Sequence, residues 1–379
     1  MPTTAPVAAN VAGAVSRRHL LQFAVSRGAL PLLAAPFLVA CGDLSLRPQQ
    51  TPRGSGAQDA ALLLPLSGEL SGIGQNMERA ASLVTSGFPA GAAPAVLDCG
   101  DSPETAAAAA RTAIAAGAKV LFGPLRAEQT TAVLSVAGNV PVVTFSNDDT
   151  LAAQGAFVMG LTPAQSVGTM LSYARAQGLT RVAILSADTP FGRASIDAAN
   201  LIAPAGGITL SAALLRAPEQ GGHVDALRSA SGGTLPQAVY IPDSGARLAA
   251  LAKGFRAADV QLLGSVQWSA ANAAVNGDLD GAWFAAPSPD LYQPFQDRFF
   301  DSFNTDAGVV AALGHDAALI AGGLADIRSL NRKGLTRAAG FTGVLGPFRF
   351  SADGRCIRSL AVLSLAGGQT QVVAEVEGT

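Results

Sequence analysis

The sequence predicts an α/β protein with two doubly wound lobes and a C-terminal β-hairpin. From Ala60 onward, short apolar runs alternate with helical stretches of roughly 10–15 residues, which is the pattern of parallel βαβ units. One sheet holding all the expected strands would be unusually wide, which favours two lobes. The chain has 379 residues, 49% of them hydrophobic, and this is enough apolar material for two cores.

The first 41 residues predict an export signal. Arg17 and Arg18 form a pair of the kind that twin-arginine signals carry, and the apolar run Gly28–Ala40 is too short to span a bilayer, which needs about 20 residues. The run ends in Leu38-Val39-Ala40-Cys41-Gly42, which resembles the lipobox of bacterial lipoproteins. We therefore expect residues 1–41 to be a signal peptide with a lipobox and Cys41 to carry a lipid that anchors the protein to the membrane. The alternatives are an ordinary cleaved signal with an incidental cysteine and a short membrane-surface helix.

The segment 42–58 predicts a flexible tether, because it is rich in Pro, Gly, Ser and Gln and has no hydrophobic periodicity. The strands expected after it are Ala60–Pro65, Ala95–Asp98, Lys119–Phe122, Val140–Phe145, Arg181–Leu185, Ile208–Leu215, Ala238–Ile241, Gln261–Leu263 and Ala282–Ala285.

Helices are expected between these strands. The clearest start is Ser102-Pro103, with Ser as the cap and Pro at the first helical position, and Gly117 ends that helix. Two further helices, Leu291–Phe303 and Gly314–Leu330, precede a β-hairpin. Its strands are expected at Gly346–Phe350 and Ile357–Leu365, with Asp353-Gly354 in the turn.

Composition argues against several function classes. The formal net charge is −2 and no basic stripe is present, so we expect no nucleic-acid partner. Three His and three Cys leave little for metal chemistry, and neither His223 nor His315 has a second ligand at metal spacing. Gly72-Ile73-Gly74 lacks the third glycine of a dinucleotide fingerprint, since Met77 holds that place.

No nucleophile elbow or phosphate loop occurs in the sequence. We therefore expect no cofactor, no metal and no catalytic residue, and an exported α/β enzyme is only a third hypothesis. Cys99 and Cys356 could form a disulfide in an oxidising compartment, but two buried thiols are the favoured interpretation.

The candidate binding residues lie mainly where parallel strands end, because ligands of open α/β sheets bind beyond the carboxyl ends of the strands. Each could also be an ordinary cap or turn residue, and Trp268 could stack on a ligand or belong to the core. The candidates for the ligand cleft are Ser67, Gly68, Asp98, Gly123, Arg126, Ser146, Asn147, Asp148, Asp188, Phe191, Asp243, Gln267 and Trp268.

Short segments along the folded part carry a family resemblance through their order and spacing. They are Leu64-Pro65-Leu66-Ser67-Gly68 with Gly74, Leu97-Asp98, Phe122-Gly123-Pro124, Val140–Ser146, Asp188 with Phe191-Gly192, His315-Asp316-Ala317, and Gly343–Gly346 with Asp353-Gly354. With these segments the chain resembles the leucine-binding-protein branch of the type I periplasmic binding proteins.

The resemblance implies the type I periplasmic binding fold, in which three hinge crossings join the lobes, and a location in the periplasm. We place the crossings near Gly160-Leu161, Ala285-Ala286 and Val344–Gly346. Lobe 1 then comprises residues 59–160 and 287–344, and lobe 2 comprises residues 161–286 and 345–379.

In this family, hydroxyl groups near the third and fourth strands hold the carboxylate of an amino acid, and an acid in the second lobe holds its ammonium. The matching positions here are Ala127, Asp148 and Val266 or Gln267, and Ile73 replaces the aromatic residue of the opening loop. These replacements make a free branched-chain amino acid a poor ligand.

The segment Phe145–Asp148, with Gly160, Pro163 and Ser172-Tyr173-Ala174, is more similar to lipoproteins called penicillin-binding protein activators. Two functions are therefore expected from the resemblance. The first is regulation of a cell-wall synthase by an anchored binding domain. The second is a solute receptor that delivers an amino acid or another small polar molecule to an ABC permease.

Overall fold

The computed structural model describes residues 59–89, 92–215, 221–270 and 277–378. The signal peptide at 1–41, its Cys41 and the tether at 42–58 lie outside the described residues and stay predictions.

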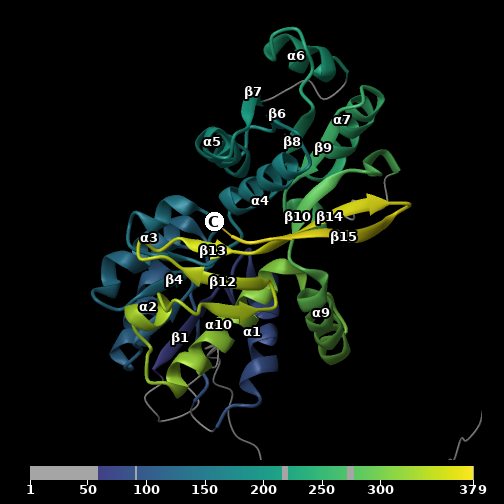
Figure 1. Cartoon of the computed structure of the whole chain (residues 1–379). Helices are drawn as coiled ribbons and strands as arrows, with labels where there is room; N and C mark the ends of the chain where they lie inside the picture. Colours follow the sequence, from purple (N-terminus) through teal and green to yellow (C-terminus); the bar gives the residue numbers. More distant parts are fainter. Residues whose placement is uncertain (1–58, 90–91, 216–220, 271–276, 379) are drawn as a thin grey trace, which may run out of the picture. The chain divides into compact units, whose positions relative to one another are not determined.

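Five parallel strands form the first sheet, in the order β2-β1-β3-β4-β5. Side chains alternate along β1: Leu63 faces the alanine-rich α2, whereas Leu62 and Leu64 face α1 and α10. Figure 1 shows the blue helices α2 and α3 beside this sheet. The elements are β1 (Ala60–Leu64), α1 (Ser71–Thr85), β2 (Ala95–Asp98), α2 (Pro103–Ala115), β3 (Val120–Phe122), α3 (Ala127–Ala137), β4 (Val142–Thr144), η1 (Asp149–Ala152), β5 (Phe157–Val158), α9 (Pro289–Phe303), α10 (Gly308–Asp326) and α11 (Arg332–Leu335).

The second sheet has the order β15-β14-β10-β9-β8-β6-β7, and its last two strands in sequence are antiparallel to their neighbours. Helices α4 and α5 cover the face that carries Ile184 and Tyr240, and α6 and α7 cover the face that carries Leu185 and Ile241. The elements are α4 (Pro163–Ala176), β6 (Arg181–Ser186), α5 (Pro190–Ala205), β7 (Thr209–Leu215), α6 (His223–Ala230), β8 (Ala238–Ile241), α7 (Gly245–Ala257), β9 (Gln261–Gly264), α8 (Gln267–Ala270), η3 (Gly277–Leu279), β10 (Trp283–Ala286), β14 (Leu360–Ala366) and β15 (Gln369–Val376).

These two sheets confirm the predicted α/β class and each strand expected between residues 60 and 286. The local signals act as expected: the Ser102 hydroxyl accepts a hydrogen bond from the Thr105 N–H in a capping box, and Pro103 opens α2. The short strand β5 and the edge strand β15 were not expected. The first is only two residues long, and the second is mostly exposed and lacks a clear apolar alternation.

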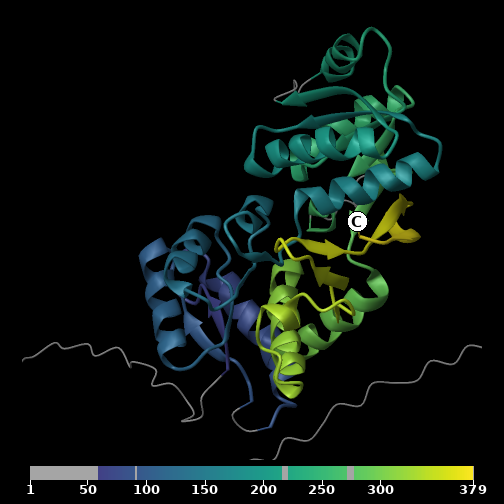
Figure 2. The ribbon, with the colours of Figure 1, turned by 60° about the vertical axis from the view of Figure 1, so that its left-hand side comes forward.

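The C-terminal hairpin is confirmed, but its second strand is divided. β12 (Gly346–Phe350) pairs with β13 (Cys356–Arg358), and β11 (Phe341–Gly343) completes a three-stranded antiparallel sheet. After Ser359 the chain enters β14 of the large sheet, where one continuous strand was expected. Both views show the yellow three-stranded sheet beside α10, and the contacts between α10 and β11 agree (Figures 1 and 2). The lobe limits at residues 160, 286 and 344 stay a prediction.

Helix α10 is long and apolar enough to cross a membrane, and it is the one helix of this kind among the described residues. Most of its side chains are buried, including Ala312, Ala317 and Ala318, which pack in the main core. Helix α1 packs closely along it because a glycine, Gly314, meets the backbone of Met77. This burial is typical of the core helix of a globular protein.

A buried arginine connects three separate segments. Arg358 on β13 is 1% exposed, and its guanidinium donates to the carbonyl oxygens of Met159 at 3.1 Å and Leu345 at 3.4 Å. The guanidinium carbon also lies 4.4 Å from the ring centre of Phe348. On the other side of the same turn, the Asp316 carboxylate accepts the N–H groups of Val344, at 2.8 Å, and Leu345, at 3.4 Å. The peptide units on both sides of Leu345 are therefore held by two buried, opposite charges.

We expect Arg358→Met to lower the free energy of unfolding by about 3 kcal/mol, because the carbonyl groups of Met159 and Leu345 lose a charged donor while buried. Urea unfolding followed by circular dichroism measures this change. The matched control is Arg349→Met on the neighbouring strand β12, where the side chain is exposed, and its effect should stay within about 0.5 kcal/mol. Equal stabilities of the two variants would contradict the role given to Arg358.

Candidate functional site

A cavity of about 370 Å³ lies at the carboxyl ends of parallel strands from both large sheets. Residues that follow β3, β4 and β5 line it from one sheet, residues that follow β6 and β9 line it from the other, and α10 closes it with one face. The lining residues are Leu125, Phe145, Asn147, Leu161, Phe191, Val266, Gln267, Val309, Val310 and Leu313. Its position fits the rule that open α/β sheets bind ligands beyond the carboxyl ends of their strands.

The cavity is mainly apolar. Apart from the amides of Asn147 and Gln267, every lining side chain is aliphatic or aromatic. Its volume lies in the range of roughly 300–1,000 Å³ that is usual for small-molecule sites. A water molecule takes about 30 Å³ in the liquid, so the space corresponds to roughly a dozen waters. Such a site can enclose a small ligand with an apolar body.

Three of the sequence-predicted residues line the cavity: Asn147, Phe191 and Gln267. Asn147 follows β4, Phe191 lies in the first turn of α5, and Gln267 begins α8. Helix α5 is fixed at this edge by Thr189, whose hydroxyl accepts a hydrogen bond from the Gly192 N–H at 3.0 Å. Their assignment to the site stays a prediction that this geometry supports.

The predicted residues on the first loop form a turn of their own. The Asp98 carboxylate accepts the N–H groups of Leu66 at 2.9 Å, Ser67 at 3.2 Å and Gly100 at 2.8 Å. Burial opposes ionisation of Asp98, but these hydrogen bonds and one from the Ser67 hydroxyl outweigh it, so the pKa of Asp98 lies below its usual value. Gly68 has a φ of +81° in this turn, which favours glycine. Ser67, Gly68 and Asp98 thus stabilise the β1 and β2 loops.

The loop after β4 is also satisfied internally. The Ser146 hydroxyl accepts the N–H of Asp148 at 3.2 Å, and the Asp148 carboxylate accepts the N–H and hydroxyl of Thr150 at 2.9 and 2.7 Å. Asp148 therefore caps the short helix η1, as an aspartate at this position commonly does. Asn147 lies between Ser146 and Asp148 in the sequence, so these hydrogen bonds hold its backbone beside the cavity that it lines.

Gly123 and Arg126 frame the loop after β3. Gly123 has a φ of +109° and approaches the Leu63 carbonyl too closely for any side chain. The Arg126 guanidinium forms ion pairs with Glu69 at 2.8 Å and Glu128 at 3.8 Å. The structure places neither Gly123 nor Arg126 in the cavity lining, which contains Leu125 between them.

The predicted residues of the second sheet, other than Phe191 and Gln267, lie outside the lining. Asp243 accepts the N–H of Ala187 at 2.8 Å and pairs with Arg247 at 3.0 Å, and Asp188 pairs with Arg193.

Trp268 is 1% exposed and its indole N–H donates to the carbonyl oxygen of Ile241 at 3.0 Å. It lies flat against Gly264 and packs near Phe284, in the core of the second sheet. Of the two interpretations left open by the sequence, the core position is the one found.

The apolar lining residues other than Phe191 were not among the sequence-based candidates, which are mainly polar or small residues at strand ends. Four of these apolar residues stand one to three residues beyond a strand: Leu125 after β3, Phe145 after β4, Leu161 after β5 and Val266 after β9. On α10, Leu313 lies three residues after Val310 and four after Val309, so the three side chains share one face of the helix. This apolar spacing could have indicated the cavity wall from the sequence.

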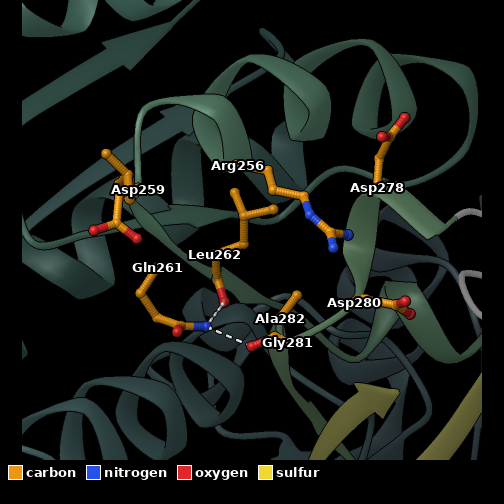
Figure 3. Close-up of a pocket in the computed structure, with 9 residues that line it drawn as sticks. Arg256, Asp259, Gln261, Leu262, Asp278, Asp280, Gly281 and Ala282 are labelled. Carbon is orange, nitrogen blue, oxygen red and sulfur yellow. Dashed lines mark hydrogen bonds between the residues drawn. The ribbon is translucent and has the colours of Figure 1, made fainter. Parts of the chain in front are cut away.

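A second hollow, of about 160 Å³, lies at the opposite ends of the strands, where Gln261 begins β9 and Ala282 precedes β10. Figure 3 shows the Gln261 amide bridging the carbonyl groups of Leu262 and Gly281, at 3.0 and 2.9 Å. It contains the acids Asp259, Asp278 and Asp280 beside Arg256. Among the described residues, no group of three or more His, Cys, Asp or Glu side chains is arranged to hold a metal ion.

Two thiols in the described part of the chain are free and buried: Cys99 and Cys356. Burial, together with the nearby Asp98 charge, raises the pKa of Cys99 to about 12, and burial raises the pKa of Cys356. Both thiols are therefore protonated at neutral pH and are poor nucleophiles.

Comparison with known proteins identifies relatives of this arrangement. A family model described as "Periplasmic binding protein" matches residues 58–369. A comparison with curated proteins found no match.

Several solved structures share the fold. A branched-chain amino acid ABC transporter periplasmic ligand-binding protein from Burkholderia xenovorans LB400 is 17% identical with a TM-score of 0.66, over 84% of this chain and 95% of that chain. A leucine-, isoleucine-, valine-, threonine- and alanine-binding protein from Brucella ovis is 13% identical with a TM-score of 0.67, over 85% and 95%. An ABC transporter solute-binding protein from R. palustris in complex with benzoate is 20% identical with a TM-score of 0.59, over 85% and 97%.

The loop beside the cavity contains one carboxyl group whose ionisation should affect stability. Burial raises the pKa of Asp149 from its usual 3.8 to about 6, although a hydrogen bond from the Thr162 side chain and the charge of Arg355 oppose this. Between about pH 4 and pH 6 the folded protein then binds a proton that the unfolded chain has released, so stability falls as pH rises through this window.

We expect Asp149→Asn to remove this dependence and to raise the free energy of unfolding above pH 6 by at most about 3 kcal/mol. At about pH 4 the variant and the original protein should be equally stable. Urea unfolding at a series of pH values measures the difference, with the exposed Asp301→Asn as control. A difference that is the same at every pH would contradict the raised pKa.

Proposed function

This chain belongs to the periplasmic binding protein family, and from that premise we propose that it is an exported solute-binding protein which captures one small molecule in the cavity at the carboxyl ends of its sheets. Its expected location is the periplasm, where a lipid on Cys41 anchors it to the membrane. The flexible tether at 42–58 lets the folded part extend away from the membrane surface.

The cavity is the observation that carries this proposal. Phe145 and Leu161 come from the first sheet, Phe191 and Val266 from the second, and Leu313 from α10, so a ligand here contacts both sheets at once. Burial of apolar surface is the main source of affinity in such a site, at about 25 cal/mol per Å².

Binding without catalysis is part of the proposal. The candidate nucleophiles Cys99 and Cys356 are buried and protonated, and the carboxylates of Asp98, Asp148 and Asp243 each serve their own loops. The cavity itself offers amides and apolar groups. Amides of this kind orient a ligand but do not transfer protons near neutral pH.

The proposed partner is an ABC permease that receives the solute. The named relatives from Burkholderia xenovorans and R. palustris are ABC transporter proteins that bind small ligands, and they support this choice through the shared fold.

A penicillin-binding protein activator-like regulator of cell-wall synthesis is the second candidate. The lipobox at Cys41 and the segment Phe145–Asp148 favour it. In that role one lobe would dock on a cell-wall synthase. Saturable capture of a purified synthase by the protein in the absence of solute would support this candidate, and capture that requires a solute would count against it.

Filling the cavity should abolish solute binding. We expect a solute from a panel of amino acids, aromatic compounds and cell-wall fragments to raise the melting temperature, and Val309→Trp to remove that rise because the indole occupies the cavity. The matched control is Ile327→Trp at the end of the same helix, where the side chain is 56% exposed and away from the lining, and it should keep the full response. Differential scanning fluorimetry checks both. A panel without any effect on the original protein would contradict the receptor function.

A further inference from the structure

We propose that the cavity selects an uncharged ligand: an apolar body that bears a hydroxyl, amide or carbonyl group held by Asn147 and Gln267. Zwitterionic amino acids and carboxylates are rejected. The inference rests on the proposed function and specifies the substrate class of the same site.

The lining contains no ionisable side chain among the described residues. A carboxylate or an ammonium that packs against this lining loses part of its hydration and finds no opposite charge among the lining side chains, which costs more than the burial of a neutral polar group. Leu125, Val266 and Val310 contribute only hydrocarbon side chains to this lining. The lining therefore favours uncharged ligands over charged ligands of the same shape.

Charged groups near the cavity mouth are engaged elsewhere. Arg126, next to the lining residue Leu125, already pairs with Glu69 and Glu128, so its charge is partly neutralised before any ligand carboxylate arrives. Asp148, next to Asn147, accepts the N–H and the hydroxyl of Thr150 on one carboxylate oxygen and caps η1. Neither Arg126 nor Asp148 is among the residues that line the cavity, so a charged ligand finds no ionic partner in the lining.

Two further acids at the strand ends, Asp98 and Asp243, also have partners in their own loops. Asp98 accepts three backbone N–H groups, and its lowered pKa reflects that environment. Asp243 accepts the N–H of Ala187 and pairs with Arg247. Removing either carboxylate from its loop would leave backbone donors without partners.

Two side-chain amides remain available for a neutral ligand. Within the described part of the chain, neither the Asn147 nor the Gln267 side-chain amide forms a hydrogen bond. Each offers two N–H donors and one carbonyl acceptor, and neither carries charge. Asn147 follows β4 of the first sheet and Gln267 follows β9 of the second, so the two amides approach a ligand from different sheets. This arrangement can hold a neutral polar group while Phe145 and Phe191 contact the apolar body.

Isosteric probes test the charge rule directly. Benzamide and benzoate have nearly the same shape and differ in charge; in a second pair, N-acetylleucinamide is leucine with both charges capped and is larger by the acetyl group. We expect the neutral member of at least one pair to bind the full-length protein at least about tenfold more tightly than the charged member, measured by isothermal titration calorimetry. Val309→Trp should abolish that binding, since it fills the cavity.

Charge placed in the lining gives the second readout. Gln267→Glu changes the charge and hardly changes the size, and it should weaken binding of the neutral probe about tenfold. The matched control is Gln75→Glu on the exposed face of α1, which should leave binding unchanged. Circular dichroism and the melting temperature confirm that both variants fold.

The outcomes separate this inference from the proposed function. If benzoate or leucine binds as tightly as its neutral partner, the charge rule is wrong and the receptor function stands. Neutral binding that survives Val309→Trp places the probe elsewhere and also overturns the rule. If only another solute of the panel binds, an uncharged solute supports the inference and a charged one overturns it. Absence of binding by all probes and panel solutes overturns both proposals.

Discussion

The binding cavity depends on a buried guanidinium. Arg358 holds the carbonyl groups of Met159 and Leu345, which lie in segments far apart in sequence, and Asp316 holds the N–H side of the same turn. The cavity residue Leu161 follows Met159 by two positions, and Leu313 precedes Asp316 by three on α10. A movement of the Leu345 turn would therefore shift two walls of the cavity. Arginine suits this position because its guanidinium stays charged when buried and offers several donors in one plane.

A second consequence follows from how the strand ends are satisfied. Asp98, Asp148 and Asp243 stand where a receptor of this fold could place ligand-binding acids, yet each stabilises a loop by accepting backbone N–H groups. Buried backbone donors must be paired, and a carboxylate pairs several at once. Because the acids are used in this way, the cavity between the loops is left to apolar side chains. The loops at the strand ends are thus rich in carboxylates, whereas the cavity that the same loops line is mainly apolar.

Membership of a binding-protein family sets the architecture but leaves the ligand open. Relatives with the same fold include a protein named for branched-chain amino acids and another solved with benzoate. At identities near 20% the scaffold persists while the lining changes, because sheet packing tolerates substitution when hydrophobic pattern and volume are kept. In this chain Val266, Gln267 and Leu125 are among the lining residues from which the proposed preference for an uncharged ligand is argued.

The sequence by itself determined the α/β class, the expected strands from Ala60 to Ala285 and the capped start of α2, because hydrophobic period and capping are properties of neighbouring residues. Three residues that it predicted at strand ends, Asn147, Phe191 and Gln267, line the cavity, and their role in binding stays a prediction. Only the tertiary structure decided that Trp268 belongs to the core, that Arg358 joins distant segments and that the lining is apolar. Those outcomes depend on contacts such as Arg358 with Met159, which are 199 positions apart, and no local pattern records which side chains meet at that separation.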